Sequence, residues 1–355
     1  MGHSVEMTYF LHLFVFSFHM PLFFIVSGFL FTHSNSITLS FGKIAYKRFR
    51  SLLLPYVITW LIIILLRIII LFYGTLATAY NATNNLIFSI THSMNSLYPA
   101  ILKSGPQFLL SLCYGTGRDM LLFGSLIHTS GILWFLPSLF SATIIFYLFL
   151  KLFDKYSIAI QSIIIILLTF AGYIIGRHLF LLPWSIDISL VAQIFMFSGY
   201  LMQKYMIFEK KTPIWFFVAA AGIWLLDLYM GGIDMILREY NYLVISIIGA
   251  IAASYLLMKL SFFLSNGTSF YYKSISYIGR QSLVILCFHT FDIVVCPPMI
   301  NYFALACLYQ FQNNHWIILT GFRLSYSLLI AEIIKLLPFM KSVYYPRTSR
   351  IIEEL

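Results

Sequence analysis

The stretch FHMPLFFIVSGFLF, residues 18–31, decides the fold class, because only His19 and Pro21 interrupt a run of apolar and small side chains. The apolar run that it ends begins near Tyr9, so the whole of 9–31 has the ~20 residues that a membrane-spanning helix needs. An ionisable side chain at membrane depth is costly and by default marks a functional candidate. The stretch therefore predicts a membrane helix that carries a candidate functional histidine.

The same stretch predicts a free backbone carbonyl and a close packing contact in this helix. Pro21 has no backbone N–H, so it leaves the carbonyl of Ser17, one turn earlier, without its helical partner. Ser27 and Gly28 are small, which favours the close approach of a second helix.

The composition extends this prediction to the whole chain of 355 residues. Hydrophobic residues make up 61% and charged residues 10%, and the mean hydropathy is +0.90. A soluble domain carries about 25% charged residues, so this chain is predicted to be an all-α integral membrane protein. About nine spans are expected, in one membrane domain that covers 1–355: 9–31, 52–73, 132–152, 158–177, 187–204, 213–230, 241–261, 281–304 and 316–338.

The basic residues predict the orientation of these spans. If the first span runs inward, sixteen of the 22 Lys and Arg residues fall on one side and four on the other, with Arg67 and Arg323 inside spans. Lys and Arg collect on the cytoplasmic side of membrane proteins. The formal net charge of +10 is therefore interpreted as topology, and no nucleic-acid partner is expected.

The interval 74–131 is too polar to span the membrane throughout, and it is predicted to be an extracytoplasmic loop. Two shorter apolar pieces, 107–114 and 120–127, are candidates for lying in the interface or for re-entering the membrane.

Five stretches in order resemble one family of membrane enzymes. After FHMPLFFIVSGFLF come KRFRSLLLPY at 47–56, LWFLPSLF at 133–140, AQIFMFSGYLM at 192–202 and GRQSLVILCFH at 279–289. The ordered set resembles the membrane-bound acyltransferase 3 family, and fucose 4-O-acetylase-like members most of all. These enzymes are O-acetyltransferases of bacterial surface polysaccharides, so the resemblance implies a multi-pass enzyme of the inner (plasma) membrane.

The resemblance also implies the substrates and the number of spans. The expected acyl donor is acetyl-CoA, used as a co-substrate with no further cofactor. The expected acceptor is a hydroxyl of a surface glycan or of its lipid-linked precursor. Members of the family have ten spans, so MGHS at 1–4 is interpreted as the end of a first span that is largely missing here.

Two histidines are the catalytic candidates. His3 matches the histidine that the family treats as essential, and a neutral imidazole can take a proton from a sugar hydroxyl. The alternative for His3 is an interfacial histidine at a frayed terminus. His19 is either a second catalytic group or a hydrogen-bonding residue that fixes helix packing, whereas His12 matches no motif and is interpreted as structural.

Three basic residues before SLLLPY are the candidates for binding the acyl donor: Lys47, Arg48 and Arg50. They lie on the predicted cytoplasmic face, where the phosphates of acyl-CoA would dock, and Arg suits bidentate phosphate contact. The alternative is simple anchoring at the membrane surface.

Polar groups within later spans are candidates for the acceptor path. His289 and Asp292 share a helix face, and either orient each other or line that path. Arg323 and Glu332 lie nine residues apart on one helix and cannot pair with each other, so each is expected to find a partner on another helix. No metal-ligand spacing is present, and no metal site is expected.

Other functions stay open at this level. A glycan transporter or flippase is the alternative from a different class, although no internal repeat of interrupted spans supports it. A third interpretation is an inactive truncated remnant of the acyltransferase. The sequence names neither the sugar and hydroxyl nor the acyl chain.

Overall fold

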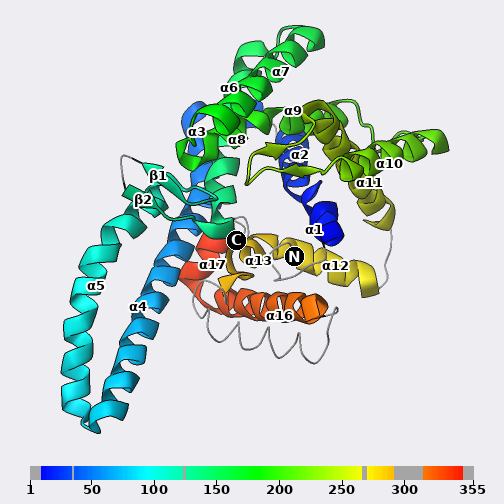
Figure 1. Cartoon of the computed structure of the whole chain (residues 1–355). Helices are drawn as coiled ribbons and strands as arrows, with labels where there is room; N and C mark the ends of the chain where they lie inside the picture. The colour runs from blue at the N-terminus through cyan, green and yellow to red at the C-terminus, as the bar shows by residue number, and fades with distance from the viewer. Residues whose placement is uncertain (1–8, 34–35, 123–124, 266–269, 292–314, 347–355) are drawn as a thin grey trace. The chain divides into compact units, whose positions relative to one another are not determined.

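The computed structural model describes residues 9–33, 36–122, 125–265, 270–291 and 315–346, and confirms the all-α class (Figure 1). The chain forms two compact units. Unit 1 consists of Met1–Leu52 and Phe135–Ser282, and unit 2 consists of Leu53–Trp134 and Leu283–Leu355.

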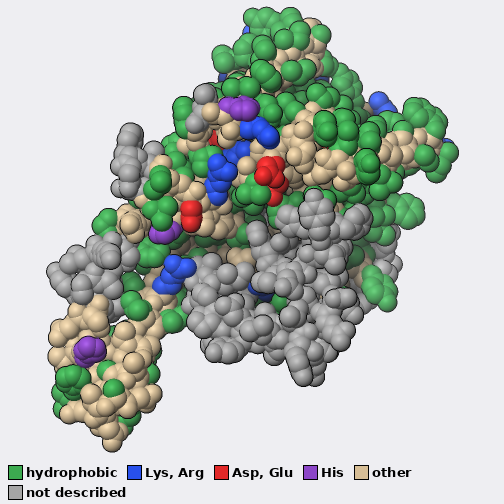
Figure 2. All heavy atoms as spheres, viewed as in Figure 1, with side chains coloured by type: hydrophobic (Ala, Val, Ile, Leu, Met, Phe, Trp, Pro, Cys, Tyr) green, Lys and Arg blue, Asp and Glu red, His purple; other side chains and the backbone are tan. Residues whose placement is uncertain are grey.

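Within the described residues, six helices are long and apolar enough to cross a membrane, or seven if one bent pair counts as a span. This finding confirms a polytopic membrane protein, and most of the predicted spans correspond to helices. The predicted span 213–230 is the shorter helix α10, Ile214–Tyr229, and the span 281–304 runs from residue 292 onward outside the described part. Figure 2 shows hydrophobic side chains over much of the visible surface, with charged side chains in scattered groups only.

Unit 1 contains most of these helices. Its longer helices are α2 (His19–His33), α6 (Phe135–Phe153), α7 (Ile158–Ile174), α9 (Gln193–Lys204), α10 and α11 (Leu243–Ser265). Shorter elements connect them: α1 (Tyr9–Phe16), α3 (Phe41–Arg48), a π-helical segment (Phe49–Leu53), α8 (Ile186–Val191), the paired strands β3 (Ile233–Asp234) and β4 (Glu239–Tyr240), and α12 (Phe270–Arg280).

The first span is broken where its proline predicts. Helix α1 ends at Phe16 and α2 begins at His19, two residues before Pro21. Ser17 lies at the break, and its hydroxyl donates to Phe14 O (2.9 Å) and accepts from Trp224 Nε1 (2.9 Å). The break therefore exposes polar groups that side chains of unit 1 satisfy.

Glycines allow α2 and α9 to pack closely. A Cβ at Gly28 would overlap the carbonyl of Met196, and one at Gly199 would overlap the carbonyl of Ile25. The two contacts are reciprocal, so each helix places a glycine against the other's backbone. The close approach predicted for Gly28 is confirmed, and its partner is α9.

Helix α9 follows a sharp bend in the chain. It meets the preceding segment Pro183–Val191 at 53°. Trp184 and Ser185 both have positive φ (54° and 49°), a conformation that side chains other than glycine rarely adopt. The predicted span 187–204 is therefore two bent pieces.

Unit 2 is built on a long helical hairpin. Helices α4 (Leu54–Thr83) and α5 (Leu86–Tyr114) lie side by side (Figure 1), joined by a turn in which Asn84 has φ 50° and Asn85 caps α5. The strands β1 (Met120–Leu122) and β2 (Ser125–Ile127) follow, and then the 3-10 turn Gly131–Trp134. The rest of unit 2 contains α13 (Ser282–Phe288), which begins at the boundary, α16 (His315–Leu336) and α17 (Pro338–Tyr344).

The predicted loop 74–131 therefore has regular structure. It contains the last turns of α4, all of α5 and the β1–β2 hairpin. Tyr56, near the start of α4, donates to the carbonyl of Leu112, near the end of α5 (2.8 Å). Helix α5 thus returns along α4 to the start of that helix.

Candidate functional site

A cavity of about 290 Å³ lies within unit 2 and is the best candidate for a ligand site. Polar and apolar side chains share its wall. The lining residues are Trp60, Ile63, Arg67, Phe108, Asp119, His128, Thr129, Ser130, Gly131, Ile132, Leu133, Cys287, Thr290 and Phe291.

One wall of the cavity is a face of α4. Trp60, Ile63 and Arg67 are spaced three and four residues apart, which places them on one side of a helix. Arg67 also lies over the ring of Phe108 from α5, with 5.6 Å between the guanidinium carbon and the ring centroid.

A second wall is the polar segment that follows α5. Helix α5 ends at Gly115, whose φ of 62° suits a left-handed cap. The segment closes on itself because Ser130 N–H donates to Thr116 O (2.8 Å) and Thr129 N–H donates to Asp119 Oδ1 (2.6 Å). The β1–β2 ladder completes the closure, with Met120 opposite Ile127.

This closure brings two titratable side chains to the cavity from the two ends of the β1–β2 hairpin. Asp119 precedes β1 and His128 follows β2. The backbone of His128 is also tied to α5, since its N–H donates to Ser111 Oγ (3.0 Å). A carboxylate and an imidazole are thus held at the cavity by backbone hydrogen bonds.

The third wall comes from α13 and the residues after it: Cys287, Thr290 and Phe291. Cys287 is a buried free thiol. Behind this wall, Thr59 Oγ1 and Tyr344 Oη share a buried hydrogen bond (2.7 Å) that links α4 to α17. Most of the polar groups that line the cavity therefore come from α4 and the 116–130 segment.

The segment after α5 gives the cavity most of its polar groups. Asp119, His128, Thr129 and Ser130 all line it, together with Arg67 of α4. The cavity is thus suited to a hydrated, hydroxyl-bearing ligand.

His289, a predicted acceptor-path residue, lies next to this cavity in the chain. Its neighbour Thr290 lines the cavity, and its own Nδ1 lies 2.8 Å from Ile285 O. A carbonyl only accepts hydrogen bonds, so Nδ1 carries the proton and the neutral ring keeps its lone pair on Nε2. Asp292, the expected partner of His289, lies outside the described residues.

Arg323 is buried in unit 2, at 4% exposure, as expected for a charge inside a span. It lies on α16, and its carbonyl accepts from Ser327 Oγ (2.6 Å). Glu332 lies on the same helix, and its carboxylate pairs with Lys335, one turn further along α16 (2.7 Å).

His19 belongs to unit 1, at the start of α2. Its Nδ1 lies 3.1 Å from Val15 O, and its ring meets the Phe16 ring edge-on at 4.7 Å. The same argument makes Nδ1 the donor to this carbonyl. These contacts bridge the break between α1 and α2. His3, the other predicted catalytic residue, lies outside the described residues.

The three predicted donor-binding residues are clustered in unit 1. Lys47 and Arg48 form the last turn of α3, and Arg50 follows in the π-helical segment. All three side chains are half-buried. Cations near a helix C-terminus are stabilised by the helix dipole, so this position also suits them without a ligand.

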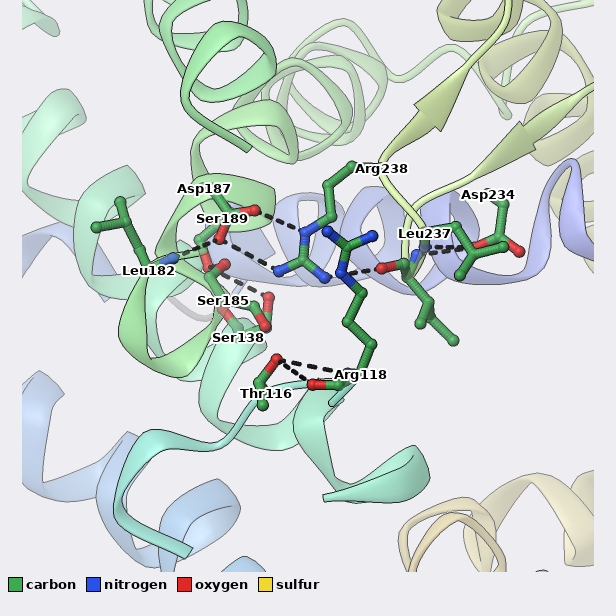
Figure 3. Close-up of polar contacts among 11 residues, drawn as sticks. Thr116, Arg118, Ser138, Leu182, Ser185, Asp187, Ser189, Asp234, Leu237 and Arg238 are labelled. Carbon is green, nitrogen blue, oxygen red and sulfur yellow. Dashed lines mark hydrogen bonds and ion pairs between the residues drawn. The ribbon is translucent and has the colours of Figure 1, made fainter. Parts of the chain in front are cut away.

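The sequence analysis missed a buried ion pair in unit 1. Arg238 Nε donates to Asp187 Oδ2 (2.8 Å), and a second contact joins Arg238 Nη2 to Asp187 Oδ1 (3.4 Å) (Figure 3). The side chains are 2% and 0% exposed. Arg238 also donates to Ile236 O (2.7 Å), and Leu182 N–H donates to Asp187 (3.4 Å).

The surroundings of this pair are closed. A Cβ at Gly176 would come within 2.6 Å of Asp187 Oδ2, so no side chain fits there. Burial raises the pKa of the nearby Tyr240 hydroxyl and keeps it neutral. This pair is a structural link between α8 and the β3–β4 hairpin, and it leaves no room for a ligand. Its partners are 51 residues apart, and no periodicity in the sequence connects them.

The residues at the cavity mouth were also missed, although one signal pointed to them. The apolar piece 120–127 stands out within the polar interval 74–131, and Asp119 and His128 flank it directly. Two titratable residues at the ends of a short apolar run are the signal that could have identified them. In the described part of the chain, no group of three His, Cys, Asp or Glu side chains gathers closely enough to hold a metal ion.

Comparison with known proteins gives one match. A family model described as an acyltransferase domain matches residues 1–332, which is nearly the whole chain. No curated protein and no solved structure matches the chain.

Proposed function

The chain belongs to the acyltransferase 3 family and is a multi-pass membrane protein; from this premise we propose that it is an O-acetyltransferase. In this proposal it moves an acetyl group from acetyl-CoA to a hydroxyl of a surface glycan or of a lipid-linked precursor. It would act in the inner (plasma) membrane, where a cytoplasmic donor and a membrane-bound sugar can meet.

The cavity of unit 2 is the observation that carries this proposal. Asp119, Thr129 and Arg67 offer the acceptors and donors that sugar hydroxyls bind, and Trp60 and Phe291 offer apolar ring faces. Its volume of about 290 Å³ is at the lower end of small-ligand sites. The cavity is thus sized for one sugar unit that enters from a longer glycan.

The chemistry requires one proton acceptor and one leaving thiolate. The sugar oxygen attacks the thioester carbonyl carbon while a base takes the hydroxyl proton. The C–S bond then breaks, the thiolate of coenzyme A leaves, and the proton passes to it. We assign the base to His3, on the family resemblance, and assign to His128 and Asp119 the binding of the acceptor.

The donor is assigned to the basic cluster of unit 1. Arg48 and Arg50 carry guanidinium groups that pair with phosphate oxygens in a bidentate way. Replacing both with alanine should raise the apparent constant for acetyl-CoA at least roughly tenfold to a hundredfold, since the loss of even one charged hydrogen bond costs ~1.5–3 kcal/mol. Unchanged donor saturation in this double variant would leave only an anchoring role for the cluster.

The test is acetyl transfer by the purified protein in lipid nanodiscs, with acetyl-CoA and a panel of surface glycans. We expect the wild-type protein to add acetyl groups that are seen by NMR of the glycan. His3→Ala should lower the turnover number by ~10²–10⁴-fold, whereas His128→Asn should mainly raise the acceptor KM.

This split in the kinetics separates the two roles. If His3→Ala keeps the wild-type turnover number, His3 is not the base. If the protein moves glycans across the membrane without acetylating any of them, the transporter alternative replaces the enzyme.

A further inference from the structure

A second hollow lies in unit 1, at the end of α9 that the charge asymmetry predicts to be cytoplasmic. It is a groove of about 330 Å³ between α2, α9, α11 and the loop after α9. The lining residues are Phe29, Leu30, Met202, Gln203, Met206, Phe208, Glu209 and Phe262.

Aromatic rings form the apolar side of this groove. Phe208 and Phe262 stack almost in parallel, with centroids 4.9 Å apart and an interplanar angle of 6°. Phe29 meets both rings edge-on, at 5.7 and 6.1 Å. Phe208 also stacks on Tyr255 of α11 (5.7 Å), so the aromatic wall is anchored in the unit.

Two polar side chains lie beside this aromatic wall. Gln203 has an amide that donates and accepts side by side, which matches the paired acceptor and donor on one edge of adenine. Glu209 is exposed and offers a carboxylate to ribose hydroxyls. A lipid tail has no hydrogen-bonding atoms and would leave both side chains without a partner on the ligand.

Lysines are chain neighbours of two lining residues: Lys204 follows Gln203, and Lys210 follows Glu209. Lys204, Lys210 and Lys211 are exposed, and they lie within eight positions of one another. Lys204 is oriented by Tyr200, whose hydroxyl accepts from its Nζ (3.2 Å). Lys259 of α11 donates to the carbonyls of Phe208 (2.8 Å) and Lys210 (3.1 Å), and so holds the loop that carries two of the other lysines.

The backbone of this loop is also constrained. Met206 has a φ of 50°, which is rare for a residue other than glycine. Three backbone hydrogen bonds hold it there: Met206 to Gln203 O, Ile207 to Met202 O and Glu209 to Met206 O (3.0, 3.0 and 3.1 Å). The groove is therefore preformed between the aromatic wall and a fixed turn.

We infer that this groove binds the adenine nucleotide end of the acyl-CoA donor. The base stacks against the exposed ring of Phe262, and Gln203 contacts its edge. The lysines bind the 3′-phosphate, which leaves the diphosphate to Arg48 and Arg50. This inference rests on the proposed function, which supplies the donor. It adds a site in a part of the chain that the sequence analysis did not connect with the donor.

The groove and the basic cluster at Arg48 belong to one set of packed helices. Tyr147 of α6 donates to Leu39 O (2.8 Å), next to the start of α3, and Phe146 of α6 meets Tyr200 of α9 at 6.0 Å. Helix α6 thus contacts both the segment that leads into α3 and the helix that leads to the groove. A donor with a nucleotide end and a long pantetheine arm can use both.

The test is equilibrium binding of coenzyme A, and of adenosine bisphosphate as its nucleotide end, to the wild-type protein in nanodiscs without any acceptor. Gln203→Leu should weaken adenosine bisphosphate about tenfold, as expected for one lost hydrogen bond. Phe262→Leu, which keeps an apolar side chain at the exposed ring of the wall, should weaken it roughly tenfold to a hundredfold through lost stacking.

The lysines allow an independent test of the same inference. Replacing Lys210 and Lys211 together with glutamine should weaken adenosine bisphosphate and remove most of the salt dependence of binding. Lys155→Gln is the matched control, because Lys155 is also exposed on the predicted cytoplasmic side but does not belong to the groove. It should bind like the wild type. Circular dichroism and gel filtration verify the fold of every variant.

The outcomes separate the two proposals. If the wild-type protein binds no coenzyme A, the proposed function and this inference both fail. If it binds coenzyme A and all three groove variants bind it equally well, the groove inference is overturned while the proposed function stands. Variants that change only the amount of co-purified lipid would assign the groove to a lipid chain instead.

Discussion

The buried pair of Arg238 with Asp187 and the cavity beside Arg67 and Asp119 use the same two kinds of charged side chain in opposite settings. In unit 1 the guanidinium and carboxylate bond each other and backbone groups, at 2% and 0% exposure. In unit 2 Asp119 is exposed, and both Arg67 and Asp119 face a cavity of about 290 Å³.

The difference shows why the first pair is structural and why the second set is the candidate for binding a ligand. A buried charge stabilises a fold only when its partner and its hydrogen bonds are all present, since desolvation is costly. A charge at a hydrated opening loses little solvation and stays available to a ligand. Mutating one site should therefore affect mainly stability, and mutating the other should affect mainly activity.

The largest effect is expected from Asp187→Ala. The substitution leaves the Arg238 guanidinium buried without its carboxylate, and such losses cost ~3–5 kcal/mol of unfolding free energy. We expect a large loss of folded protein, measured by chemical unfolding in mild detergent. Asp187→Leu combined with Arg238→Met should recover much of the loss, because it removes both charges. Equal instability of the single and double variants would contradict the ion-pair account.

Asp119→Ala should change the acceptor KM strongly and the unfolding free energy only slightly. It removes one carboxylate from the cavity, so the acceptor KM should rise roughly tenfold to a hundredfold if that group binds a sugar hydroxyl. The unfolding free energy should fall by ~1 kcal/mol or less, since the lost contact is one exposed bond to Thr129 N–H. A loss of stability like that of Asp187→Ala would make Asp119 a structural residue too.

Arg67→Gln should have a smaller effect on the acceptor KM, roughly threefold to tenfold. Glutamine keeps donors at the cavity but removes the charge and the contact over Phe108, which at an exposed site contributes ~0.5–1 kcal/mol. The measurement is the acceptor KM at two salt concentrations. A wild-type KM at both would remove Arg67 from the acceptor site.

The smallest effect is expected from Glu332→Gln. Glu332 is 53% exposed and its pair with Lys335 is of the i, i+3 kind, so the loss should be ~0.5 kcal/mol or less. Unfolding in detergent should place this variant within error of the wild type, with normal acetylation. A loss of several kcal/mol would mean that exposure does not separate the two classes of ion pair in this protein.

Much of the fold could be predicted from local features of the sequence. Apolar runs of the right length mark most of the spans, and Pro21 marks the break between α1 and α2. Gly28 was expected to allow a close helix approach, and it does so against α9. The regular structure of 74–131 was not predicted, because α5 is amphipathic and depends on α4 for packing rather than on its own hydropathy.

The candidate site was predictable only in part. The apolar run 120–127 can be recognised in the sequence. The hydrogen bonds that bring Asp119 and His128 to the same cavity, however, join positions that are distant in the chain. The pair of Asp187 and Arg238 has no sequence signature at all. The bend at Trp184 and the β3–β4 hairpin place Asp187 and Arg238 next to each other.

The sequence by itself determined that this protein lies in a membrane, where most of its helices run and to which family it belongs. Those properties follow from transfer free energy and from motifs, which are sums over neighbouring residues. Only the tertiary structure decided which charges are closed off and which face a cavity. That choice depends on contacts between segments far apart in the chain, and the same side chain is structural in one such setting and available to a ligand in the other.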